Sequence, residues 1–253
     1  MKHIHFTAAP HEDAQNAFDE LTALYGQADL DKADVIVPLG GDGTLLDTLH
    51  KKATKDIPVF GMNKGSVGFL MNHYAAEDLP ARLKKAQLYE IHPLRMRAKT
   101  CDGEEFESVA FNEVAIFRAS RQASKISIYV DDHLRMAELI ADGVMVSSPA
   151  GSTAYNFSAH GPILPLSANL LALTPISPFR PRRWRGALLP QHHEIRFVVN
   201  DPANRPVSAT ADSMEVKDIC EVTIWQSRSI ERQLMFDPEQ NLEERIINEQ
   251  FVI

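Results

Sequence analysis

Residues 35–44 read VIVPLGGDGT and decide the fold of this chain, because an apolar run leads directly into three glycines. A short apolar run predicts a buried strand, and glycines let the backbone that follows approach a bulky anion closely. Such a loop is suited to cradling phosphate. Asp42 does not fit a pure anion site, because a carboxylate repels phosphate unless a cation or a proton transfer makes use of it. The loop therefore indicates phosphate chemistry, with Asp42 as its candidate reactive group.

The residues around this loop continue an alternation of strands and helices. Apolar runs predict strands over residues 4–8, 35–39 and 57–61. Helical spacing predicts helices over residues 12–26, 45–53 and 76–86. Residues 1–90 are therefore predicted to form a Rossmann-like parallel α/β domain with ligands at the carboxyl ends of its strands.

Two details of this domain bear on its chemistry. Asp is a favoured N-cap residue, so Asp42 has a purely structural alternative, but Thr44 is expected to take the capping role and leave Asp42 available. Residues 63–70 form a second glycine-spaced loop after a strand, with Phe69 and Leu70 as an apolar wall. Two such loops at adjacent strand ends are expected to form one crevice.

After residue 88 the helical periodicity gives way to short alternating segments. Residues 94–100 and 105–111 flank an Asp-Gly pair, which predicts a hairpin. Similar alternation recurs through residue 224, so residues 91–234 are predicted to form an all-β domain, a sandwich of antiparallel sheets. The tail, residues 235–253, returns to helical composition over 241–251 and is expected to pack back on the first domain.

Composition excludes several classes of protein. Lys plus Arg number 26 against 34 for Asp plus Glu, a net charge of −8, so nucleic acid is not expected as a partner. The basic cluster at 180–185 is the exception, and either a solvated loop or a subunit contact accounts for it. Cys101 and Cys220 show neither zinc-site nor disulfide-framework spacing, which favours a reducing compartment. No apolar run approaches the roughly 20 residues that span a bilayer, so no membrane association and a cytoplasmic location are expected.

Two further stretches carry polar chemistry. Asn112 and Glu113 stand at a strand start, where an amide beside a carboxylate suits sugar hydroxyls and exocyclic amines, although such a pair also serves as a strand-end cap. Residues 142–164 read as a strand, a Pro-Ala-Gly turn and a helix whose first turn carries hydroxyls and Tyr155. A flat aromatic there can stack on a base, and an ordinary capped helix is the structural alternative.

Together these stretches resemble the signatures of the NAD kinase family. The GGDGT loop, the Asn112–Glu113 pair and the run from 142 to 164 occur in the family's usual order, with 63–70 between the first two. The first motif alone is also similar to diacylglycerol and sphingosine kinases and to 6-phosphofructokinases. The Gly-Ser-Thr-Ala-Tyr block at 151–155 is not their pattern.

The resemblance implies a reaction and a set of residues. The 2'-hydroxyl of the adenosine ribose of NAD would attack the γ-phosphate of ATP, with a divalent cation such as Mg²⁺, and Asp42 would orient and deprotonate that hydroxyl. Arg118 and Lys125 are the candidate positive partners of the phosphates, no protein metal ligand is assigned, and a homodimer or homotetramer held by the sandwich domain is implied. The residues expected to bind NAD or ATP are Gly41, Gly43, Thr44, Asn63, Phe69, Asn112, Glu113, Lys125, Asp142, Ala150, Thr153, Ala154, Tyr155, Asn156, Phe157 and Ser158.

This chain departs from the family pattern at a few positions. Ser148 and Ala150 replace the two threonines of the usual Ser-Thr-Pro-Thr, and His160 stands where glycine is common. Asp212-Ser213-Met214 stands where the family often shows Asp-Gly followed by a polar amide. Two other functions stay open on the sequence alone: a lipid or sugar kinase that shares the glycine loop, and a sensor that binds NAD or NADP without turnover.

Overall fold

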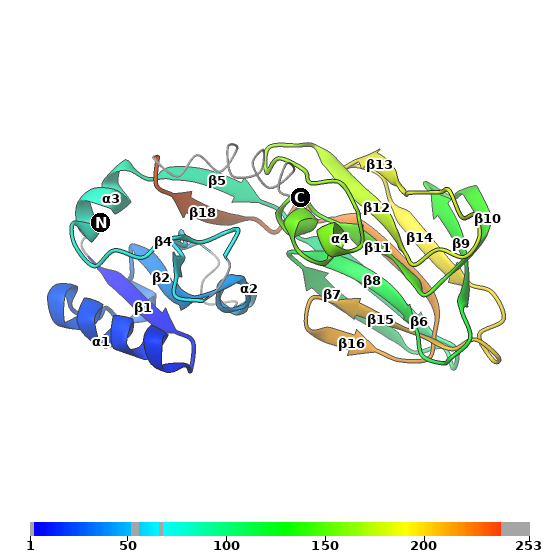
Figure 1. Cartoon of the computed structure of the whole chain (residues 1–253), viewed down its shortest axis with the longest axis horizontal. Coiled ribbons are helices and arrows are strands. Elements are labelled where there is room, and N and C mark those ends of the chain that lie inside the picture. The colour runs from blue at the N-terminus through cyan, green and yellow to red at the C-terminus, as the bar shows by residue number, and fades with distance from the viewer. Residues whose placement is uncertain (1–2, 52–55, 66–67, 239–253) are drawn as a thin grey trace. The chain divides into compact units, whose positions relative to one another are not determined.

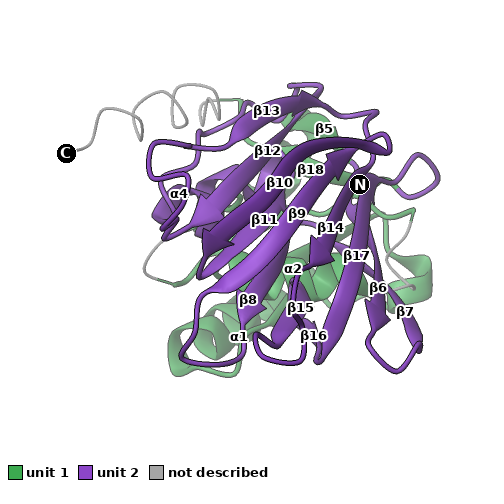
Figure 2. Cartoon of the chain, turned by 90° about the vertical axis from the view of Figure 1, so that its right-hand side faces the viewer, with its two compact units in different colours: residues 1–91, 231–253 green, residues 92–230 purple. Residues whose placement is uncertain are grey.

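The computed structural model describes residues 3–51, 56–65 and 68–238, and it divides into two compact units. One unit comprises Met1–Ile91 and Glu231–Ile253, and the other comprises His92–Ile230. Figure 2 shows the two units in different colours. Each unit has its own hydrophobic core and is described by itself.

The first unit is built on a parallel sheet in the order β1-β2-β3-β4, flanked by helices (Figure 1). Its elements are β1 (Ile4–Ala8), α1 (Glu12–Tyr25), η1 (Leu30–Lys32), β2 (Val35–Gly40), α2 (Asp42–His50), β3 (Met62–Asn63), β4 (Asn72–His73), α3 (Leu79–Lys85), β5 (Gln87–Ile91) and β18 (Arg232–Phe236). Every residue of β2 is buried, as expected for an inner strand with apolar contacts on both faces. The predicted parallel α/β layer is confirmed.

The strand predicted over residues 57–61 is wrong. Only Val59 forms an isolated bridge, to Ile36 and to Leu234, and the regular strand is Met62–Asn63. Ile36 donates to the carbonyl of Pro58 and accepts from Phe60 N. Two residues farther on, Pro38 has no N–H to continue the ladder on this side of β2, so pairing is interrupted before Met62.

Two helices differ from their predicted bounds. The helix expected over 45–53 begins three residues earlier, at Asp42, and its end near Ala53 lies outside the described residues. The helix expected over 76–86 is confined to Leu79–Lys85, with Pro80 in its first turn, where a missing N–H costs nothing.

The second unit, all of whose residues are described, is a sandwich of two six-stranded sheets (Figure 2). The sheet orders are β10-β9-β14-β17-β6-β7 and β13-β12-β11-β8-β15-β16, and every pairing within them is antiparallel. The elements are β6 (Leu94–Thr100), β7 (Glu105–Ala110), β8 (Glu113–Arg118), β9 (Ser124–Val130), β10 (His133–Ala141), β11 (Gly143–Ser147), η3 (Ala150–Thr153), α4 (Tyr155–Ser158), β12 (Leu170–Ile176), β13 (Ala187–Pro190), β14 (Ile195–Val199), β15 (Val207–Ala211), β16 (Met214–Val216) and β17 (Ile219–Gln226). The predicted sandwich and its hairpin at residues 102–103 are confirmed.

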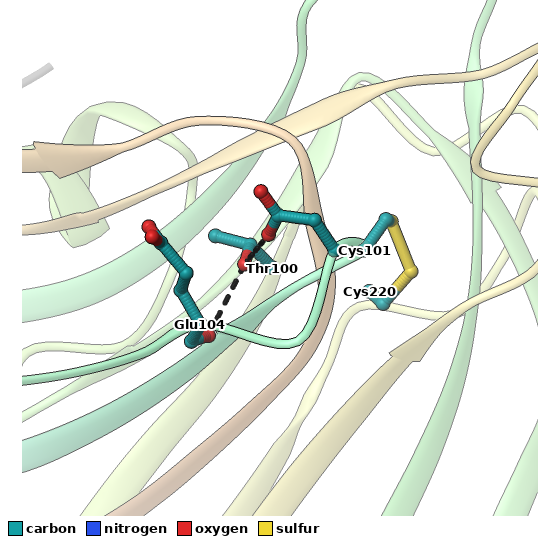
Figure 3. The surroundings of a disulfide bond; sticks show 5 residues. Thr100, Cys101, Glu104 and Cys220 are labelled. Atoms are coloured by element: carbon teal, nitrogen blue, oxygen red, sulfur yellow. Dashed lines mark hydrogen bonds between the residues drawn. A yellow bond between two sulfur atoms is a disulfide. The ribbon is translucent and has the colours of Figure 1, made fainter.

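The two cysteines form a disulfide, although the sequence indicated no disulfide framework. Cys101 follows β6 and Cys220 lies in the neighbouring strand β17, with their Cα atoms 5.0 Å apart (Figure 3). The register of the two strands shifts between Ile219 and Glu221, at Cys220. The cysteines are 119 residues apart in sequence, so their spacing carried no sign of the pairing. The cysteines therefore no longer support a reducing compartment.

The chain returns to the first unit after the sandwich. β18 pairs with β5, and Met235 joins the core of the first unit. Asp237 accepts from Arg82 at 2.6 Å. The predicted helix over 241–251 lies outside the described residues. None of the described helices is long and apolar enough to cross a membrane.

Replacing Cys101 and Cys220 together by serine is expected to lower the free energy of unfolding of the sandwich unit by roughly 2–4 kcal/mol, because the unfolded chain regains the freedom that the cross-link removes. Urea denaturation of both proteins measures the difference. In a strong reductant the two proteins are expected to unfold at the same urea concentration. Equal stability under oxidising conditions would contradict the prediction.

Candidate functional site

The glycine loop of the first unit joins β2 directly to α2. Gly41 is the N-cap of α2 and Asp42 is its first residue, and no side chain caps the helix. The expected capping by Thr44 is therefore wrong, because Thr44 is already the third helical residue and donates its amide to Gly41 O at 3.0 Å. A Cβ on Gly40 would lie 2.3 Å from Thr44 Oγ1, so this position requires glycine.

The carboxylate of Asp42 accepts hydrogen bonds from the second loop. Phe69 N donates to Oδ2 at 2.9 Å and Leu70 N donates to Oδ1 at 3.0 Å. Two amides and the N-terminus of α2 stabilise negative charge at this position. The amides thus hold the plane of the carboxylate in one orientation.

The two glycine loops lie side by side, as predicted. β2 and β3 are parallel neighbours, with Gly40 opposite Asn63. A Cβ on Gly65 would stand 3.5 Å from Gly41 Cα, and Lys64 N donates to Gly40 O at 2.8 Å. Asn63 Oδ1 accepts from Gly65 N at 2.9 Å, which closes the turn. Whether Asn63, Phe69, Gly43 or Thr44 contacts a ligand stays a prediction.

In the second unit the Asn112–Glu113 pair lies against the turn at 148–151. Asn112 O accepts from Ser148 N at 2.9 Å, and a Cβ on Gly151 would lie 2.2 Å from the same oxygen. Ser148 donates its hydroxyl to Phe111 O and accepts from Gly151 N. Glycine at 151 is therefore required by the close approach of two backbones.

Asp212 is a member of this cluster whose structural role the sequence did not reveal. Its carboxylate accepts from Phe111 N at 2.7 Å and from Asn112 N at 3.0 Å, across about 100 residues of sequence. Asp212 has a φ of 49°, in the left-handed region, which Asp tolerates better than most residues. The sequence signal that could have indicated this role was an Asp at the end of a strand, directly before a turn.

Glu113 is the most perturbed carboxyl of the cluster. Its Oε2 atom is buried and has no hydrogen-bond partner among the residues that the structure describes. Burial raises the pKa of the Glu113 carboxyl from 4.5 to about 7, and the neighbouring Asp212 carboxylate adds to the rise. Perturbed carboxyls of this kind gather at functional sites, so a polar ligand group is the natural partner for Oε2.

The helix predicted after the Pro-Ala-Gly turn is shorter than expected. A 3-10 turn, Ala150–Thr153, precedes a helix of only four residues, Tyr155–Ser158. Asn156 is buried, and its amide binds Ser152 O, Pro162 O and the hydroxyl of Thr174. Ala150 is buried as well, whereas Ser158 is exposed, and Thr153, Ala154 and Phe157 are half-buried. The structure thus turns Asn156 inward and Tyr155 outward.

A cavity of about 700 Å³ opens beside Tyr155. The ring of Tyr155 lies 5.8 Å from that of Phe117, at 31°. Arg118 Nε donates to Asp142 Oδ1 at 2.6 Å. The pKa of the Tyr155 hydroxyl is raised by burial and by the carboxylates of Glu113 and Asp142. The cavity is lined by Phe117, Arg118, Ala119, Ser120, Arg121, Asp142, Tyr155, Ile176 and Ser177.

The remaining candidates lie apart from this cavity or are structural. Lys125 is on β9, in the opposite sheet, and pairs with Glu138 at 3.4 Å. His160 has a φ of 62°, which explains why glycine suits the position. Met214 packs against the sandwich core and not beside Tyr155. Six members of the cavity were not among the predicted site residues: Phe117, Ala119, Ser120, Arg121, Ile176 and Ser177.

Comparisons with known proteins agree along the whole chain. Residues 2–87 match the model of the ATP-NAD kinase N-terminal domain, and residues 111–234 match that of the ATP-NAD kinase C-terminal domain. NAD kinase of Xanthomonas campestris pv. campestris (strain 8004) is 54% identical over 255 residues, covering 100% of this chain and 99% of its own. NAD kinase of Xylella fastidiosa (strain 9a5c) is 54% identical over 250 residues, covering 99% and 96%.

Two solved structures share the fold. The yeast NADH kinase in complex with NADH has a TM-score of 0.84 at 22% identity, over 98% of this chain and 87% of its own. An NAD kinase from Archaeoglobus fulgidus in complex with ATP has a TM-score of 0.76 at 24% identity, over 97% of each chain.

A parallel α/β unit with a glycine loop is followed by a two-sheet sandwich, and the matching domain models place this architecture among kinases of small molecules. The two matching domain models and the relatives at 54% identity make the assignment specific. The chain belongs to the NAD kinase family. It is a phosphotransferase that acts on NAD, and the alternative of a lipid or sugar kinase is not supported.

The free energy of unfolding is expected to fall as pH rises from about 4.5 to about 7, because the folded state then holds a proton on Glu113 that the unfolded state has released. The stabilisation is complete below the unfolded pKa and is lost as pH rises through the folded one. Glu113→Gln should remove up to roughly 3 kcal/mol of this dependence.

Chemical denaturation at pH 5, 6 and 8 measures the effect. Glu215→Gln, at an exposed position of β16, is the matched control and should follow the wild-type profile. Parallel pH profiles for wild type and Glu113→Gln would show that Glu113 is ionised in the folded protein across this range.

Proposed function

We propose that the chain transfers the γ-phosphoryl group of ATP to the 2'-hydroxyl of the adenosine ribose of NAD, giving NADP and ADP. The anchoring of Asp42 carries this proposal. A carboxylate held by Phe69 N and Leu70 N at the end of a glycine loop is positioned to accept a proton from a hydroxyl. Phosphoryl transfer depends mainly on positioning and charge neutralisation, so a base of modest strength suffices.

The first unit is assigned to the phosphates and to the proton transfer. Gly41 and Gly43 leave the backbone open at the start of α2, where amides and the helix dipole favour an anion. Asp42 orients and deprotonates the attacking hydroxyl. We also assign a role in ligand binding to Thr44, Asn63 and Phe69, which belong to the two glycine loops and the start of α2.

The second unit is assigned to the dinucleotide. Glu113, with a buried oxygen that lacks a partner, and Asn112 beside it suit ribose hydroxyls and amide groups. The exposed face of Tyr155 offers a stacking surface, and Asp142 and Thr153 are assigned to the polar ends of the ligand. The assigned segment also includes Ala150, Ala154, Asn156, Phe157 and Ser158. The buried amide of Asn156 stabilises this segment through hydrogen bonds with Ser152 and Thr174.

The divalent cation is proposed to arrive with ATP. Among the described residues no group of three or more His, Cys, Asp or Glu side chains is arranged to hold a metal ion. Mg²⁺ is commonly bound by substrate phosphates and one or two carboxylates, and Asp42 fits that role as well as that of a base. The cation would neutralise charge on the transferring phosphoryl group. A cytoplasmic location is proposed on the basis of these substrates and not of the cysteines, which form a disulfide.

A homodimer or homotetramer built through the sandwich is proposed as the assembly. The edge strands β10 and β13 carry Leu134 and Leu188, which are 52% and 48% exposed. Phe179, directly before the basic cluster, is 50% exposed, and Arg180 and Arg182 stack over its ring. Aromatic and arginine side chains are enriched at such interfaces. Light scattering should give a mass at least twice that of one chain.

The reaction is tested by incubating the protein with NAD, ATP and Mg²⁺ and detecting NADP with a dehydrogenase that accepts only NADP. Asp42→Asn is expected to lower kcat by roughly 10²- to 10⁴-fold, as losing a general base does, while NAD still binds. Asp47→Asn, an exposed position of the same helix, is the control and should keep full activity. Asparagine has one side-chain oxygen, so Asp42→Asn also loses one of the two hydrogen bonds from the second loop. Thermal unfolding of both variants shows whether this loss destabilises the protein. Unchanged turnover in Asp42→Asn would make Asp42 structural.

A further inference from the structure

The cavity beside Tyr155 carries more positive charge than negative, although the whole chain has a net charge of −8. Its charged lining consists of Arg118, Arg121 and Asp142. Arg118 and Asp142 form an ion pair at 2.6 Å and neutralise one another. The guanidinium of Arg121 remains as the net charge of the cavity.

Each cation expected from the sequence already has a carboxylate partner. Lys125 pairs with Glu138 and does not line the cavity. Arg118 donates both to Asp142 and to Ser120 O. Arg121 is exposed, and within the described part of the chain no hydrogen bond or ion pair of its side chain is found.

The loop that carries Arg121 is held in place on both sides. It spans residues 119–123, between β8 and β9. Ala119 N donates to Pro206 O at 2.8 Å, and the guanidinium of Arg205 binds Ala123 O. Gln122 N donates to Ser120 Oγ at 3.2 Å. Fixing the loop lowers the entropy that Arg121 loses on binding a ligand.

The chemistry of the lining indicates an aromatic anion. Phe117, Tyr155 and Ile176 give apolar and aromatic surface, and the volume of about 700 Å³ is in the range of small-molecule sites. A guanidinium matches phosphate oxygens with two parallel hydrogen bonds. We propose that Arg121 binds the pyrophosphate of the dinucleotide substrate in this cavity, an inference that rests on the proposed function.

Arg121→Ala is expected to raise the KM for NAD roughly tenfold, which corresponds to about 1.4 kcal/mol for one charge-assisted contact. The value of kcat should change less than twofold, because a contact made equally before and during the reaction affects binding only. Arg121→Lys should recover part of the loss. Arg135→Ala, at an exposed position of β10 outside the cavity, is the matched control.

Ligand fragments separate a phosphate contact from a general disturbance of the cavity. ADP-ribose carries the pyrophosphate and adenosine does not, so Arg121→Ala should weaken binding of ADP-ribose about tenfold, measured by calorimetry, and leave adenosine unchanged. Equal weakening of both ligands, or of neither, would overturn the proposal. A rise in the KM for ATP without one for NAD would overturn it too.

Calorimetry also distinguishes the failure of this inference from the failure of the proposed function. If the wild type formed no NADP, the kinase reaction would be refuted. The loss of ADP-ribose affinity in Arg121→Ala would still decide whether Arg121 binds pyrophosphate.

Discussion

The anchoring of the Asp42 carboxylate by two backbone amides is the interaction on which the glycine loops depend. Phe69 N and Leu70 N reach it from the loop after the next strand, across 27 and 28 residues. These bonds and the N-terminus of α2 favour negative charge, so they stabilise a carboxylate within the glycine loop. The same bonds join the two loops, so the orientation of the Asp42 carboxylate and the geometry of the loops depend on one another.

The sandwich unit contains a second carboxylate that is held by two consecutive backbone amides. The Asp212 carboxylate accepts from the consecutive amides of Phe111 and Asn112, as Asp42 does from Phe69 and Leu70. Glu113 follows directly, and its pKa is raised mainly by burial and also by the charge of Asp212. A carboxylate with two backbone partners thus lies beside one whose buried Oε2 has no partner among the described residues, and this contrast supports the proposal that Glu113 binds a ligand.

Much of the fold was predictable because it depends on local pattern. The buried run of β2, the alternation in β9 and β14, and the Asp-Gly hairpin all follow from apolar spacing and turn residues. Errors arose where a single residue changed the local pairing. Pro38 interrupts the hydrogen-bond ladder that residues 57–61 were expected to form with β2. Gly41, and not Thr44, is the N-cap residue of α2.

The sequence by itself determined the two types of domain, the glycine loop with Asp42, and the family, because these are written in contiguous stretches. Only the tertiary structure decided which distant groups meet. The Cys101–Cys220 bond joins residues 119 positions apart, and the hydrogen bonds of Asp212 reach residues about 100 positions away. Arg118, which was expected to bind phosphate, forms an ion pair with Asp142. Such pairings depend on strand order and register, which spacing along the chain does not specify.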